Sequence, residues 1–170
     1  IVLLLLFVPV SVEAASSYAV VDAETGRVLM GEAEDERHPI ASLTKMWTAL
    51  VAIEEGNLND TVTISRKAVY SEGSSIYLQE GDQYKLEELL YGLMLRSGND
   101  AATAIAEHVG GSVEGFVKLM NDKAAIHGLN GTTFTNPSGL HHETPLSTAA
   151  DTARMLQIAM KNETFRKIAS

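Results

Sequence analysis

The sequence predicts an α+β fold, because two β-prone runs near its start precede segments with mostly helical patterns. The 170 residues are 45% hydrophobic and 21% charged, with four prolines and thirteen glycines, a composition typical of one globular domain. We find no internal repeat, low-complexity tract or linker-like stretch in the sequence. A single domain is therefore expected.

The two β-prone runs are residues 18–22 and 27–30, and residues 23–26 join them. Gly26 can supply the positive φ that a tight hairpin turn requires. Two strands alone are only marginally stable, so we expect further strands or a helical layer to cover one face of the hairpin.

The helical segments are recognised by apolar residues at helical spacing and by glycine or capping residues at their ends. The expected helices are Ser42–Glu55, Lys85–Arg96, Asp100–Val109, Val113–His127 and a helix that Ser147 caps and that ends at Lys161. Residues 61–65 predict a short strand, and residues 130–144, rich in Thr, Asn, Gly and Pro, predict an ordered loop.

The charge and the missing cysteines exclude several functions. Thirteen basic and 22 acidic residues give a net charge of -9, which repels phosphate backbones, so no nucleic-acid partner is expected. The absence of cysteine excludes disulfides, thiolate metal sites and cysteine nucleophiles.

The first residues predict a signal peptide. Residues 1–10 are apolar apart from Pro9, and the small residues that follow favour cleavage after Ala14. Ten apolar residues are too few to span a bilayer. The alternative to a signal peptide is a buried strand or helix. No initiator Met or basic segment precedes Ile1, so we expect the sequence to begin inside the signal. Residues 15–170 would then belong to an exported, extracytoplasmic domain.

Ser42 and Lys45 form the first candidate site. A serine three residues before a lysine on a helix shares a face with it. Lys45 is the only charged residue between Pro39 and Ile53, in a helix that is apolar nearly all round. Burial lowers the pKa of a lysine, and the neutral amine could then activate the serine. The alternative makes Ser42 a helix cap and lets Lys45 reach the solvent.

Ser97-Gly98-Asn99 forms the second candidate site. It lies at a turn between two expected helices, where both short polar side chains could point into one cleft. Gly98 would allow another group to approach closely. The alternative is an ordinary capped turn between helices.

Together these motifs resemble the serine D-alanyl-D-alanine carboxypeptidases, the penicillin-binding proteins of peptidase family S11. Ser-x-x-Lys, Ser-x-Asn and Lys-Thr-Gly are the signature that penicillin-binding proteins share with class A β-lactamases. Further similar segments are Tyr18–Asp22 with Thr25-Gly26, Ala41–Met46, Leu95–Ala101, Phe134–Leu140 and Leu146–Ala149.

The resemblance implies a β-lactamase/transpeptidase-like fold and an acyl-enzyme mechanism. Ser42 would attack the carbonyl between the terminal D-alanines of a peptidoglycan stem peptide, with Lys45 as proton acceptor. Ser97 would relay a proton to the leaving amine, and Asn99 would bind the substrate and help to hold Lys45. β-Lactam antibiotics would acylate the same serine, and neither a metal nor an organic cofactor would be needed.

The sequence departs from the family pattern in two places. Lys-Thr-Gly is absent from the 170 residues, so we expect a fold truncated before its C-terminal strands and inactive in this form. Membrane attachment, if present, would depend on a segment beyond Ser170. Where many relatives carry a histidine before Ser-Thr-Ala, this sequence has Pro145.

Three other functions remain open. A class A β-lactamase would need a glutamate in a Glu-x-x-Leu-Asn setting, but residues 128–140 contain no acid and Glu143 lacks those neighbours. A non-catalytic protein that only binds wall peptides would have no need for a set of four polar residues, namely Ser42, Lys45, Ser97 and Asn99. A metallopeptidase at His141-His142-Glu143 would lack the His-Glu-x-x-His spacing.

Overall fold

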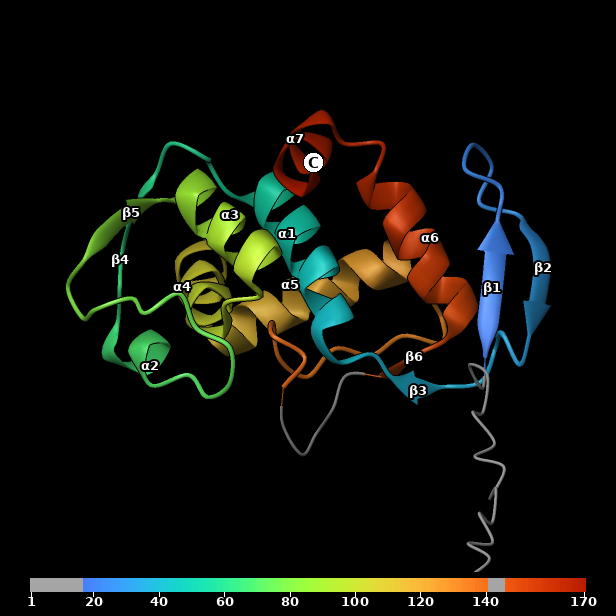
Figure 1. Cartoon of the computed structure of the whole chain (residues 1–170), viewed down its shortest axis with the longest axis horizontal. Coiled ribbons are helices and arrows are strands. Elements are labelled where there is room, and N and C mark those ends of the chain that lie inside the picture. The colour runs from blue at the N-terminus through green and yellow to red at the C-terminus, as the bar shows by residue number, and fades with distance from the viewer. Residues whose placement is uncertain (1–16, 141–145) are drawn as a thin grey trace, which may run out of the picture.

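A computed structural model of the chain describes residues 17–140 and 146–170. Helices surround α1, and a two-stranded hairpin lies at one end of the molecule beside α6 (Figure 1). The predicted signal peptide, the His141-His142-Glu143 group and Pro145 lie outside the described residues. Within the described ranges, no helix has the length and hydropathy of a membrane span.

The helices account for most of the elements. They are α1 Thr44–Glu55, α2 Arg66–Val69, α3 Leu86–Arg96, α4 Asn99–Gly110, α5 Val113–Ile126, α6 Ala149–Ala159 and α7 Glu163–Ala169. The strands are β1 Tyr18–Val21, β2 Val28–Glu32, β3 His38–Pro39, β4 Thr61–Thr63, β5 Gln83–Lys85 and β6 Leu146–Ser147. They form three antiparallel pairs, β1 with β2, β3 with β6 and β4 with β5.

The predicted hairpin and long helices are confirmed, with two corrections at helix ends. Ser147 was expected to cap the helix after it, but it lies in β6, opposite His38 of β3. Thr148 is the cap, since its hydroxyl accepts the backbone N–H of Asp151 at 3.0 Å. Ser42 is not in α1 but in a 3₁₀ turn, residues 41–43, immediately before it. Neither α2 nor α7 was expected from the sequence pattern.

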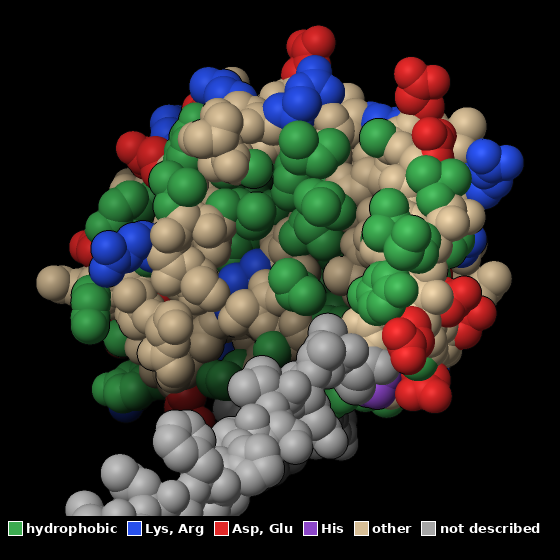
Figure 2. Space-filling model, turned by 45° about the vertical axis from the view of Figure 1, so that its right-hand side comes forward, with side chains coloured by type: hydrophobic (Ala, Val, Ile, Leu, Met, Phe, Trp, Pro, Cys, Tyr) green, Lys and Arg blue, Asp and Glu red, His purple; other side chains and the backbone are tan. Residues whose placement is uncertain are grey.

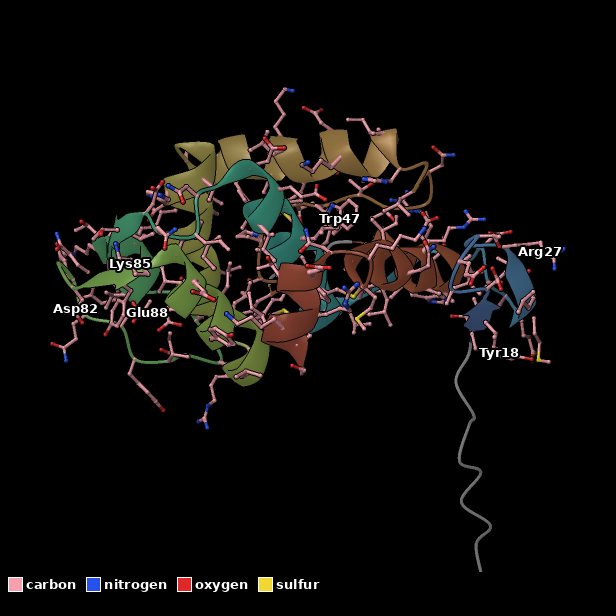
Figure 3. The ribbon with its side chains drawn as sticks, turned by 90° about the horizontal axis from the view of Figure 1, so that it is seen from above. Tyr18, Arg27, Trp47, Asp82, Lys85 and Glu88 are labelled. Carbon is pink, nitrogen blue, oxygen red and sulfur yellow. The ribbon has the colours of Figure 1, made fainter. Side chains whose placement is uncertain are left out.

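The core is built around α1, because this helix is apolar on nearly every side. It contacts α3, α4, α5, α6 and α7, and Trp47, Leu50 and Val51 are fully buried. The Trp47 ring lies among the helices (Figure 3) and stacks on Phe134 with ring centroids 6.3 Å apart. A lysine on this helix is therefore packed among buried side chains and is not free to extend into the solvent.

Candidate active site

Ser42 lies on an exposed turn just before α1, where it lines a groove of about 860 Å³. The groove lies between the N-terminal end of α1, β1 and the helices α6 and α7, and its lining is mainly apolar. Figure 2 shows hydrophobic side chains gathered over one face of the molecule. Ser42, Lys45 and Ser97 all line the groove, so the structure brings three of the four predicted site residues together.

Lys45 is buried, with 3% of its surface exposed. Its ammonium nitrogen lies 3.4 Å from the Ser42 hydroxyl and donates to the Ser138 carbonyl at 2.8 Å. No carboxylate pairs with it among the residues described. Desolvation therefore lowers the pKa of Lys45 to about 8. The predicted burial and lowered pKa are confirmed, and the alternative of a solvent-facing lysine is wrong.

The loop of residues 134–140 provides the carbonyl that holds Lys45. The Asn136 side-chain oxygen accepts the backbone N–H groups of Ser138 at 3.1 Å and Gly139 at 2.7 Å. This turn fixes the direction of the Ser138 carbonyl, which would otherwise have several orientations. The loop is ordered over residues 134–140, as predicted, but no motif in the sequence links it to the lysine.

Gly139 allows this loop to approach the turn that carries Ser42. Its φ is +79°, and a Cβ at this position would overlap the backbone carbonyl oxygen of Ala41. The same Cβ would also press on the Thr44 hydroxyl. Only glycine satisfies both the left-handed backbone and the lack of space.

Replacing Gly139 with alanine should therefore push the loop away from the Ser42 turn. We expect a loss of at least about 2 kcal/mol in the free energy of unfolding. Gly128→Ala is a matched control, because Gly128 has φ +70° but open space around its Cβ position. That control should cost only the backbone strain, about 1 kcal/mol. Urea unfolding of both variants checks the difference, and equal losses would contradict the close approach.

The turn between α3 and α4 carries the other two predicted site residues. Ser97 ends α3 in the left-handed conformation, with φ 55°, and lines the groove. Asn99 begins α4 and is only 4% exposed. Its amide nitrogen donates to the Glu72 carbonyl at 2.6 Å, whereas its side-chain oxygen has no partner in the described part of the chain.

Ser97 and Asn99 were expected to point into one cleft, but only Ser97 lines the groove that holds Ser42. Asn99 lines a neighbouring cavity of about 290 Å³, together with Glu72 and Ser138, because the Glu72 carbonyl draws its amide to that side. No hydrogen bond joins Asn99 to Lys45 within the described ranges. The carbonyls of Glu72 and Ser138 could not be predicted, since every residue has this group and no motif marks it.

The groove thus combines an exposed hydroxyl with a buried amine of lowered pKa. Such an amine can accept the proton of the hydroxyl as the oxygen attacks a carbonyl. No group of His, Asp or Glu side chains within residues 17–140 and 146–170 is placed to hold a metal ion.

Residues 8–169 match the family model of peptidase S11, described as D-alanyl-D-alanine carboxypeptidase. The chain is 40% identical over 158 residues to the D-alanyl-D-alanine carboxypeptidase DacF of Bacillus subtilis (strain 168), covering 90% of this chain and 41% of that protein. It is 38% identical over 163 residues to DacB2 of Mycobacterium tuberculosis (strain ATCC 25618 / H37Rv), covering 95% and 56%. The chain thus spans about half the length of these curated relatives.

Solved structures show the same similarity. The crystal structure of D-alanyl-D-alanine carboxypeptidase from Mycobacterium tuberculosis H37Rv superposes with a TM-score of 0.88 at 38% identity, covering 95% of this chain and 61% of that one. Penicillin binding protein 5 from Haemophilus influenzae gives 0.82 at 34% identity, covering 90% and 47%. These superpositions confirm the predicted α+β, transpeptidase-like fold.

Proposed function

Because this chain belongs to the peptidase S11 family of D-alanyl-D-alanine carboxypeptidases, we propose that the whole protein removes the terminal D-alanine from peptidoglycan stem peptides. The observation that supports this most directly is the 3.4 Å approach of the buried Lys45 amine to the Ser42 hydroxyl. A lysine with a pKa of about 8 has a useful neutral fraction near pH 7. Ser42 can then act as a nucleophile without a histidine.

The proposed reaction has two steps. In the first step Lys45 takes the proton of Ser42, and the serine oxygen attacks the carbonyl between the two terminal D-alanines. The peptide bond breaks, Ser97 relays a proton to the departing amine, and the shortened peptide remains as an ester on Ser42. In the second step water hydrolyses the ester, which releases the new carboxylate and restores the hydroxyl. Asn99 is the proposed substrate-binding residue; because its amide nitrogen donates to the Glu72 carbonyl in this structure, its side chain would have to turn towards the groove to contact the substrate.

The same groove would accept β-lactam antibiotics as covalent inhibitors, because the lactam carbonyl takes the place of the scissile one. We propose no nucleic-acid partner, in keeping with the net charge of -9.

We further propose that residues 1–14 are part of a signal peptide, and that residues 15–170 are the N-terminal part of an exported, extracytoplasmic carboxypeptidase domain. These assignments rest on the sequence pattern and on the family.

Incubating the full-length protein with an acylated tripeptide extended by D-Ala-D-Ala tests the proposal. We expect release of one D-alanine per peptide, whereas the same peptide ending in L-Ala-L-Ala should stay intact. Binding without release would instead favour a non-catalytic wall-peptide-binding protein. Rapid repeated hydrolysis of penicillin, in place of a long-lived adduct, would favour a β-lactamase.

A further inference from the structure

Asp100 is a buried carboxylate that the proposed reaction does not use. It lies in the first turn of α4 and is 1% exposed. Its oxygens accept the Ser75 hydroxyl at 2.7 Å and the backbone N–H groups of Ile76 and Leu78, each at 3.1 Å. The N–H of Ala101 donates to it at 2.9 Å. No cation pairs with it in the part of the chain that the structure describes, so these hydrogen bonds alone compensate its buried charge.

The residues that Asp100 holds belong to a segment that we call the clamped segment, residues 72–78. This segment also contacts the turn that carries Ser97 and Asn99. The backbone N–H of Asn99 donates to the Ser74 carbonyl at 2.7 Å, and the Asn99 amide donates to the Glu72 carbonyl at 2.6 Å. Asp100 therefore anchors the same stretch of chain that orients its neighbour.

Close packing adds to these hydrogen bonds. The side chain of Ile76 occupies the space that a Cβ at Gly92 would need, and at Gly98 a Cβ would meet both the Asp100 carboxylate and Ile76. The clamped segment therefore lies directly against the glycine at the centre of the Ser97-Gly98-Asn99 turn. A shift of the segment would change the packing of the turn on one side.

Tyr77 shows that the segment does not take its shape by local preference. Its φ is +64°, which is unfavourable for a tyrosine, and its side chain is 84% exposed, so burial does not offset the strain. Its N–H donates to the Ser75 hydroxyl at 2.8 Å, and that hydroxyl in turn donates to Asp100. The hydrogen bonds around Tyr77 hold its strained backbone conformation, and in most of them the Asp100 carboxylate is the acceptor.

We propose that Asp100 is a positioning residue for the reaction, whose carboxylate holds the clamped segment against α4 and thereby fixes Ser97 and the Asn99 amide. This inference rests on the proposed function, because it assigns Asp100 an effect on Ser42 acylation. Asp100 acts only through its neighbours. It makes no contact with the groove that holds Ser42.

Asp100→Asn in the full-length protein tests the inference. Asparagine keeps the size of the side chain but replaces one acceptor oxygen by an NH₂ group. That group cannot accept the hydrogen bonds that the carboxylate oxygen receives. We expect faster hydrogen exchange over residues 72–78, and an acylation rate constant with penicillin, per titrated active site, that falls about tenfold or more. Counting only titrated sites removes any unfolded fraction from the rate.

Glu107→Gln is the matched control. Glu107 lies on the same helix, and its carboxylate accepts the Ser65 hydroxyl at 2.5 Å, but it is about two turns away from Asp100. It should leave the acylation rate constant within about twofold of the wild-type value. Ser75→Ala removes only one of the bonds to Asp100 and should slow acylation about threefold, whereas Ser75→Thr keeps a hydroxyl and should restore the rate.

Each outcome decides the matter. Wild-type acylation in Asp100→Asn, with or without a loosened segment, would overturn the inference and leave the proposed function standing. Equal slowing in Glu107→Gln would reduce Asp100 to a purely structural role. If Asp100→Asn does not fold, the comparison of Ser75→Ala with Ser75→Thr decides instead. A wild-type protein that forms no adduct would refute the proposed function, and this inference would fall with it.

Discussion

Replacing Ser42 with alanine in the full-length protein should abolish the covalent penicillin adduct and reduce D-alanine release by at least about a thousandfold. The hydroxyl is the nucleophile of the acylation step, and it is exposed to the groove beside the Lys45 amine. Since the side chain is on the surface, its loss should leave the free energy of unfolding nearly unchanged. Mass spectrometry after penicillin treatment measures the adduct directly.

Ser17→Ala is the control for this experiment. Ser17 also lines the groove, but no lysine donates to its hydroxyl in the described ranges. That variant should form the adduct at the wild-type rate. Peptide mapping that placed the adduct on any residue other than Ser42, or that found it undiminished in Ser42→Ala, would refute the assignment of the nucleophile.

The acylation rate of the wild-type protein should follow the deprotonation of Lys45. Burial lowers the pKa of Lys45 to about 8, so the amine is mostly protonated below that pH and mostly neutral above it. We expect the rate to rise about tenfold per pH unit up to pH 7 and to level off above pH 8. Near pH 7 about a tenth of the lysine is neutral, against less than about a thousandth for an ordinary lysine.

Lys45→Arg should abolish both the pH dependence of the acylation rate and the acylation activity itself. A guanidinium stays protonated throughout the range and cannot accept the serine proton, so we expect at least about a thousandfold slower acylation at every pH. Lys123→Arg is the matched control, because Lys123 is also largely buried but pairs with Glu54 and Glu55 at 2.7 and 2.8 Å, away from the groove. It should stay within about twofold of the wild-type rate.

Stopped-flow measurements of acylation between pH 5 and pH 10 give both results. A flat wild-type profile would show that another group, and not Lys45, accepts the proton. A Lys45→Arg variant that kept the profile would lead to the same conclusion. Circular dichroism on each variant separates a lost proton acceptor from a lost fold.

The elements that local sequence determines were predicted closely. The span of α3 differs from the observed one by a single residue, because leucines at helical spacing lie between well-marked ends. The burial of Lys45 also followed from sequence, since it is the one charged residue between Pro39 and Ile53 in a helix that is apolar on nearly every side. Short elements such as α2, which has four residues, were not predicted, because they have too few positions to form a pattern.

The position of Ser42 and Lys45 and their apolar surroundings follow from local sequence, because a 3₁₀ turn that leads into a helix brings residues three apart close together. The groups that hold these two side chains come from distant parts of the chain. The Ser138 carbonyl is 93 residues from Lys45 along the chain, and Glu72 is 27 residues from Asn99. Backbone carbonyls have no side-chain signature, and the folded path of the chain alone brings them to their partners.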